Sequence, residues 1–133
     1  LDAKCYLGEG PCWVPEAGKL LWVDIHAGDV HTFDPYDSSD SKINMGGCVS
    51  FALPSSDRAS LVCAVRRSLV LVDAASGVVR ERIIDVEEGL EDNRFNDGKC
   101  DPAGHLIAGT MDDTEKAATG SLYSFSGGGA AGG

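Results

Sequence analysis

The chain has 133 residues, of which 43% are hydrophobic, so it is long enough and apolar enough to form one globular domain. Its 21 acidic residues outnumber the 11 basic residues and give a net charge of −10, which argues against binding to nucleic acid or to an anionic membrane surface. No apolar run approaches the length that crosses a bilayer, so we expect a soluble protein without a membrane partner.

Short apolar segments separated by turn residues follow one another from the start of the chain, a pattern typical of β-strands. In the first group, turns begin at Pro15 and Ala27, and a polar loop is expected over residues 36–41. The expected strands of this group are 11–14, 20–25, 30–34 and, more weakly, 42–45.

The same order of turns and strands recurs twice along the chain. The expected strands of the second and third groups are 49–53, 61–65, 69–73, 78–85, 106–110 and 121–125, with a tight connection at Arg66-Arg67. The first turns of the three groups begin at Pro15, Pro54 and Pro102, about 40 to 50 residues apart, which is the repeat length of β-propeller blades.

This repeat predicts an all-β fold, and a β-propeller rather than a sandwich of unrelated hairpins. A propeller closes with about four to eight blades, whereas this chain supplies about two and a half to three. We therefore expect a partial propeller over residues 1–126 and a Gly/Ala-rich disordered tail over residues 127–133. The chain would then be the N-terminal part of a longer propeller, cut or ended early.

The five cysteines do not follow a disulfide or zinc pattern, because their number is odd and they lack paired spacing. Most lie in segments expected to be strands, where small buried thiols of a reducing compartment are common. We therefore predict a cytoplasmic protein with free thiols at Cys5, Cys12, Cys48, Cys63 and Cys100.

The most polar block of the chain opens the third group, at residues 93–104. Its second half, Asp101-Pro102-Ala103-Gly104, suits a β-turn, because Asp, Pro and Gly favour the first, second and last turn positions. Its first half, Asn93-Arg94-Phe95-Asn96-Asp97, is denser in polar groups than a hairpin requires. We interpret this first half as a place where side chains converge on a site.

Two strings of the sequence, Gly8-Glu9-Gly10-Pro11-Cys12-Trp13 and Asn93-Arg94-Phe95-Asn96-Asp97-Gly98-Lys99, carry a resemblance to a known family. They resemble the opening and the most distinctive internal block of the family of regucalcin (senescence marker protein), gluconolactonase and luciferin-regenerating enzyme. The resemblance covers nearly all of the ordered chain. It implies a six-bladed propeller, a divalent metal in the central channel, often Ca²⁺ or Zn²⁺, and hydrolysis of sugar lactones or similar esters.

By this resemblance, Glu9 corresponds to a metal ligand of the family. A carboxylate at the start of the first strand can ligate a hard divalent cation, and a solvated loop acid is the plain structural alternative. The other ligands of the family, an asparagine and an aspartate that serves as the general base, come from later blades. We therefore expect no complete catalytic site in this chain, and weak or absent binding of Ca²⁺ or Zn²⁺.

Arg94 and Asn96 match positions that contact the substrate in the family. The arginine side chain offers a fork of donors, and the asparagine amide offers donors and an acceptor, which suits a sugar with several hydroxyl groups. If this segment is extended, Phe95 points the opposite way, into the core of the blade.

The family also has an acidic substrate contact shortly after this block. A direct count places Thr114 at that position, and a small shift places Asp113 or Glu115 there. Asp113 and Glu115 are therefore further candidates for substrate binding.

The other candidate ligands and bases have ordinary interpretations. The histidines His26, His31 and His105 share no spacing, so we interpret each as a surface or strand residue. Asp24 and Asp34 close two strands of the first group and are expected to cap turns.

Three functions remain open from the sequence. The first is a fragment of a metal-dependent sugar-lactone hydrolase, with a small-molecule sugar lactone as its partner. The second is a non-catalytic calcium-binding or scaffold propeller that keeps the fold without turnover. The third is a half-propeller that self-associates through the open blade edge near residues 122–125.

Overall fold

The structure is a computed structural model, and it describes residues 1–127. Within these residues the backbone forms β-strands joined by turns and bends, and it contains no helix long and apolar enough to cross a membrane. The predicted all-β fold is therefore confirmed. The predicted tail at 127–133 lies, from residue 128 onward, outside the described residues.

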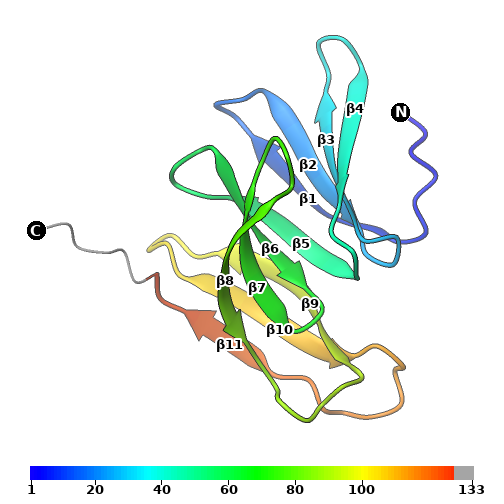
Figure 1. Ribbon diagram of the computed structural model, residues 1–133, viewed down its shortest axis with the longest axis vertical. Coiled ribbons are helices and arrows are strands. Elements are labelled where there is room, and N and C mark those ends of the chain that lie inside the picture. Colours follow the sequence, from blue (N-terminus) through cyan, green and yellow to red (C-terminus); the bar gives the residue numbers. More distant parts are fainter. Residues whose placement is uncertain (128–133) are drawn as a thin grey trace, which may run out of the picture.

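The strands form three antiparallel sheets that follow one another along the chain (Figure 1). The first sheet contains β1 (Gly8–Val14), β2 (Lys19–Asp24), β3 (Asp29–Asp34) and β4 (Ser39–Asn44). The second contains β5 (Val49–Pro54), β6 (Ser60–Val65), β7 (Ser68–Asp73) and β8 (Val79–Asp85). The third contains β9 (Asn93–Cys100), β10 (Leu106–Asp112) and β11 (Leu122–Phe125). Each sheet pairs its strands in sequence order, as the blades of a β-propeller do.

Two strands differ from the sequence prediction. β4 begins at Ser39, inside the predicted polar loop, because residues from Ser39 to Ser41 pair with the edge of β3. The polar block at 93–104 provides the whole of β9, which pairs along β10 from Asn93 to Cys100. In both places the polar composition indicated a loop although the segment is a strand. A strand can expose many of its side chains to solvent while its backbone forms hydrogen bonds with a neighbouring strand.

Two apolar clusters hold the sheets together, and β5 contributes to both. The first lies between the first and second sheets and contains Leu21, Val23, Ile25, Val30, Val49, Ala52, Leu61, Cys63, Val70 and Val72. The second lies between the second and third sheets and contains Phe51, Leu53, Ala64, Leu69, Val86, Phe95 and Ala108. Along β5, Phe51 and Leu53 face the second cluster while Ala52 faces the first, as strand alternation requires.

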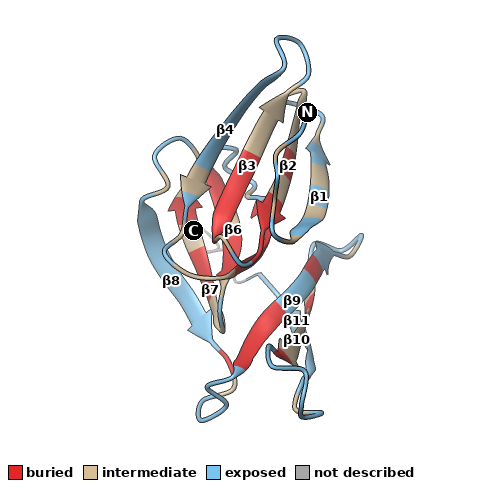
Figure 2. Cartoon of the chain, turned by 90° about the vertical axis from the view of Figure 1, so that its right-hand side faces the viewer, coloured by how far each residue is buried: buried red, intermediate tan, exposed pale blue. Residues whose placement is uncertain are grey.

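Phe95 is the centre of the second cluster and is fully buried. It lies in β9, part of which is coloured as buried in Figure 2. Its ring lies 6.0 Å from the ring of Phe51 and 6.5 and 6.3 Å from the rings of Tyr123 and Phe125. Gly98 permits this packing, because a Cβ at that position would lie 2.6 Å from the Phe51 ring. The prediction that Phe95 packs into the core is confirmed.

The first strands of the three sheets share an irregularity. β5 contacts both β1 and β9, and each of the three strands has a register shift near its start. The shifts lie between Glu9 and Cys12 in β1, between Val49 and Ala52 in β5, and opposite Gly109 and Thr110 in β9. Such bulges bend a strand and change the direction of its side chains, which is why they are frequent beside functional sites.

Five connections lie at one end of the sheets, because alternate turns of an antiparallel meander lie at the same end. They are residues 25–28, 45–48, 66–67, 86–92 and 113–121. We call this end of the molecule the loop end. Backbone hydrogen bonds join its connections, since Arg66 N donates to Cys48 O at 2.8 Å and Phe95 N donates to Arg66 O at 2.7 Å.

Asp112 organises the connection between β10 and β11 at the loop end. Its carboxylate accepts hydrogen bonds from the hydroxyl and backbone N–H of Thr114 and from the backbone N–H groups of Lys116 and Ala117. The Thr114 side-chain hydrogen bonds, followed by those from the backbone, lower the pKa of Asp112 from 3.8 to about 2. The ionised form of Asp112 therefore fixes the residues that follow it.

All five cysteines are free thiols, as predicted, although Cys100 is exposed. Cys63 is buried in the first cluster, and this burial raises the pKa of its thiol to about 12. Asp24 accepts hydrogen bonds from the backbone N–H groups of Tyr6, Leu7 and Ala27, which confirms its role as a cap.

The outer strands of the sheets are largely exposed. Every residue of β8 is exposed (Figure 2), and Leu122 at the start of β11 is 77% exposed. Within residues 1–127, β11 pairs only with β10. Self-association through this edge stays a prediction.

We expect Phe95→Ala to lower the free energy of unfolding by about 3–5 kcal/mol, because it removes a fully buried aromatic ring. Tyr36→Ala is the control, since Tyr36 is 98% exposed and its removal should change stability by less than about 0.5 kcal/mol. Chemical denaturation of both variants measures the difference. Equal stability of the two variants would contradict the packing described for Phe95.

We also expect stability to fall with acid in a way that depends on Asp112. Since the pKa of Asp112 is lower in the folded state than in the unfolded state, its contribution is present above about pH 4 and is lost as the pH falls toward about 2. Asp112→Asn should be less stable than the wild type at neutral pH and should lose less stability over this acidic range. Urea unfolding at several pH values tests this, with the exposed Asp2→Asn as control, and identical pH slopes for Asp112→Asn and wild type would refute it.

Candidate functional site

The candidate residues from the sequence lie at the loop end. Glu9 and Arg94 each occupy the second position of the first strand of a sheet, β1 and β9. Asn96 follows on β9 with its side chain exposed, whereas Arg94 is buried. Asp113 and Glu115 lie in the connection that Asp112 organises, between β10 and β11.

Arg94 is held rigidly by three hydrogen bonds. Its Nε donates to Oδ1 of Asp113 at 2.5 Å, and its Nη1 donates to the carbonyl oxygen of Phe95 at 2.9 Å and to Oδ1 of Asn96 at 3.3 Å. The Arg94 side chain is 7% exposed and that of Asp113 is 36% exposed. A buried guanidinium requires such a partner, because an unpaired buried charge costs several kcal/mol.

The structure thereby separates the two acidic candidates. Asp113 contacts Arg94 directly, and its backbone N–H donates to the carbonyl oxygen of Asp92. Glu115 is exposed, has a positive φ of 57°, and its backbone N–H donates to the carbonyl oxygen of Asp112. Asp113 therefore belongs to the same constellation as Arg94 and Asn96, while Glu115 lies on the turn beyond it.

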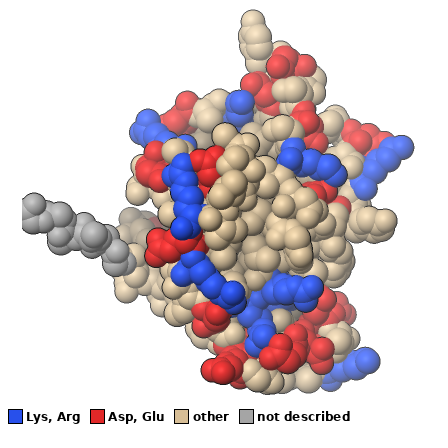
Figure 3. All heavy atoms as spheres, in the orientation of Figure 1, with Lys and Arg blue, Asp and Glu red and all other residues tan. Residues whose placement is uncertain are grey.

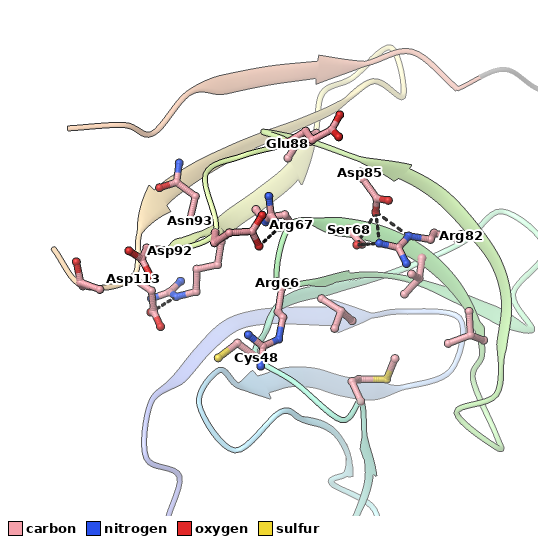
Figure 4. Close-up of a pocket in the computed structure, with 18 residues that line it drawn as sticks. Cys48, Arg66, Arg67, Ser68, Arg82, Asp85, Glu88, Asp92, Asn93 and Asp113 are labelled. Carbon is pink, nitrogen blue, oxygen red and sulfur yellow. Dashed lines mark hydrogen bonds and ion pairs between the residues drawn. The ribbon is translucent and has the colours of Figure 1, made fainter. Parts of the chain in front are cut away.

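Arg94 and Asp113 border a pocket of about 790 Å³ between the second and third sheets (Figure 4). Its lining is rich in charge, with the arginines Arg66, Arg67, Arg82 and Arg94 and the acids Asp85, Glu88, Glu91, Asp92 and Asp113. Several of these charges pair with one another, as in the contact of Arg67 with Glu91 and of Arg82 with Asp85. Figure 3 shows that acidic and basic side chains also adjoin on the molecular surface.

A network around Glu87 supports this constellation, and no motif in the sequence indicates it. Glu87 accepts hydrogen bonds from the Thr110 hydroxyl, the Tyr123 hydroxyl and the side-chain amide of Asn93. Asn93 in turn pairs with Thr119 through both of its amide atoms. The connection before β9 is thus attached to β10 and β11, which fixes Arg94 next to its partner.

The metal that the resemblance implies does not fit Glu9 alone. Glu9 is exposed, and among the described residues it belongs to no group of three closely spaced His, Cys, Asp or Glu side chains. A hard cation such as Ca²⁺ takes about six to eight oxygen ligands. One carboxylate on β1 cannot meet that requirement.

The arrangement as it stands can bind a polar ligand. The hydrogen bonds of Arg94 fix the plane of its cationic guanidinium group. Asn96 presents an exposed amide beside it, and Asp113 retains a second carboxylate oxygen. Donors and acceptors therefore lie side by side at the loop end, as recognition of vicinal hydroxyl groups requires.

Comparison of the sequence with those of known proteins identifies relatives of this chain. A "Putative sugar lactone lactonase YvrE" of Bacillus subtilis is 36% identical over 124 residues, which are 92% of this chain and 41% of that protein. A "6-deoxy-6-sulfogluconolactonase" of Pseudomonas putida is 37% identical over 108 residues, which are 79% of this chain and 35% of that protein.

Among solved structures, a calcium-binding regucalcin from Agrobacterium tumefaciens superposes with a TM-score of 0.80 and 30% sequence identity. The match covers 90% of this chain and 40% of that one, and it confirms the propeller fold. The chain thus spans about two fifths of the length of the relatives it matches. The model of the SMP-30/gluconolactonase/LRE-like region matches residues 7–132, so the chain belongs to this family.

Proposed function

We propose that this chain forms the substrate-holding side of a sugar-lactone hydrolase. The observation that carries the proposal is the buried Arg94, which lines the pocket, is fixed by Asp113 and lies beside the exposed amide of Asn96. The names of the lactonase relatives from Bacillus subtilis and Pseudomonas putida support this substrate class.

The chemistry of a sugar lactone matches these groups. Such a substrate has one ring ester and several hydroxyl groups, and its hydrolysis adds water to the carbonyl carbon and breaks the ring C–O bond. Arg94 donates to hydroxyl or carbonyl oxygens, whereas the Asn96 amide both donates and accepts. These residues orient the sugar ring, because their own hydrogen bonds leave them few alternative positions.

Asp113 has two tasks in this proposal. Its Oδ1 holds Arg94, and its second oxygen accepts a hydrogen bond from a substrate hydroxyl. Glu115 is a further acceptor for a substrate that extends over the turn, since its side chain is exposed. Both roles concern binding, and we assign no general base to this chain.

We further propose that Glu9 provides one oxygen ligand to a divalent cation, Ca²⁺ or Zn²⁺, in the complete protein. Its place at the start of β1, level with Arg94 on β9, supports this role. The calcium-binding regucalcin of Agrobacterium tumefaciens also makes a non-catalytic calcium-binding propeller the alternative function. Lactone turnover by the complete protein distinguishes the two.

In the complete protein, Arg94→Ala should lower kcat/KM for a sugar lactone by about 10- to 100-fold, the equivalent of the about 1.5–3 kcal/mol of a hydrogen bond to a charged group. Asn96→Ala should lower it by about 2- to 10-fold, since a neutral hydrogen bond contributes about 0.5–1.5 kcal/mol. Initial rates measure both effects, and thermal melts show whether each variant is folded. Arg94→Lys separates charge from geometry, since it keeps the charge but loses the fork.

Arg80→Ala is the matched control, because Arg80 pairs with Asp73 at the opposite end of the second sheet. It should leave kcat/KM unchanged. If Arg94→Ala and Asn96→Ala both keep full turnover and affinity, the polar block of β9 has no part in substrate binding, and the proposal is wrong.

For calcium, we expect this chain to gain little thermal stability from micromolar Ca²⁺, because stabilisation requires a ligand concentration above the dissociation constant. Glu9→Gln should therefore melt at nearly the same temperature as the wild type with and without Ca²⁺. Differential scanning calorimetry provides the test. A rise of the melting temperature in Ca²⁺ that disappears in Glu9→Gln would show a more complete calcium site than one carboxylate supplies.

A further inference from the structure

Three side chains that the proposed reaction does not combine meet at the loop end. His26 lies between β2 and β3, Cys48 lies between β4 and β5, and Asp113 lies between β10 and β11. One ligating atom of each residue lies within 4.8 Å of the others. Each comes from a different connection, so the cluster exists only because the three sheets pack with their loop ends together.

The separation of these atoms suits a metal ion between them. The Cys48 sulfur lies 4.0 Å from Nδ1 of His26, which is long for a strong hydrogen bond. Zinc bonds sulfur at about 2.3 Å and imidazole nitrogen at about 2.0–2.1 Å. Two such ligands therefore stand roughly 3.5 Å apart at a tetrahedral angle, and at most about 4.4 Å apart on opposite sides of the ion. The 4.0 Å between Cys48 and His26 lies within these limits and shortens slightly when the two bind one tetrahedral ion. The three side chains are exposed or half-buried, so an ion can reach them from solvent.

The same geometry disfavours a catalytic relay of Cys, His and Asp. In a relay, one ring nitrogen of the histidine faces the nucleophile and the other faces the carboxylate. Here a single ring nitrogen of His26 lies near both the sulfur and the carboxylate oxygen. The three groups converge on one point, which is the arrangement of ligands around an ion.

The surrounding charges select the kind of ion. Arg94 already occupies Oδ1 of Asp113, and Figure 4 shows Arg66 beside Cys48. Two nearby guanidinium groups lower the affinity of the site for a cation that is bound mainly by the negative charge of oxygen ligands, such as Ca²⁺ or Mg²⁺. A thiolate and an imidazole instead form strong bonds with ions such as Zn²⁺ and Co²⁺.

We propose that His26, Cys48 and Asp113 bind a divalent transition-metal ion such as Zn²⁺, with water in the fourth position. On binding, the Cys48 thiol releases its proton to solvent and the sulfur forms a bond with the metal. The ion joins three connections of the loop end and shares Asp113 with Arg94. The site is separate from Glu9, and the proposal does not depend on lactone hydrolysis.

Titration of the protein with Co²⁺ tests the proposal, because a cobalt–thiolate bond has a charge-transfer absorption in the near ultraviolet. We expect this band to saturate at one ion per chain and to disappear in Cys48→Ser. His26→Gln and Asp113→Asn should weaken binding by about 10-fold or more, since even partners outside the ligand set contribute about 10- to 100-fold. Cys100→Ser is the matched control, because Cys100 is an exposed thiol at the far end of β9, and it should keep the band.

A second measurement uses the wild-type protein and therefore does not depend on whether the variants fold. In the wild-type protein, Zn²⁺ should shield Cys48 from alkylation while Cys100 continues to react, as read by peptide mass spectrometry. Glu9→Gln should leave both results unchanged. The proposal is overturned if wild-type protein gives no band and no protection, if the band persists in Cys48→Ser, or if Glu9→Gln removes it.

Discussion

The position of β9 depends on the backbone of Arg66. Its N–H donates to Cys48 O at the start of the second sheet, and its carbonyl accepts from Phe95 N at the start of the third. These two hydrogen bonds fix where β9 begins relative to the second sheet. Phe95 then enters the cluster with Phe51, and the residues on either side of it must point elsewhere. The location of Arg94 is therefore a consequence of how two sheets are joined.

Burial of Arg94 is the feature that links packing to chemistry. A guanidinium that is 7% exposed is stable only with an anionic partner, and Asp113 provides it from a connection that Asp112 holds in place. The same ion pair restricts the rotation of the Arg94 side chain and fixes the direction of its N–H donors. A flexible surface arginine would lose more conformational entropy when it binds a small polar ligand.

The loop end contains two sets of groups with different chemical preferences. Arg94 and Asn96 offer hydrogen bonds to hydroxyl groups, whereas His26 and Cys48 offer nitrogen and sulfur to a transition metal. Asp113 belongs to both sets. A metal on Asp113 would add positive charge beside Arg94, so occupancy of one set affects the electrostatic environment of the other.

The sequence by itself determined the features that depend on near neighbours. Alternation and turn residues located most strands, the β-turn after Asp101, and Phe95 in the core, and two short strings indicated the family. The sequence did not predict β9 as a full strand, because its many polar residues are typical of a loop and do not show that its backbone pairs with β10. Only the tertiary structure decided that Arg94 pairs with Asp113, 19 residues away, and that His26 meets Cys48, 22 residues away. Such contacts depend on how the sheets pack through their apolar clusters, and no local pattern of residues specifies that geometry.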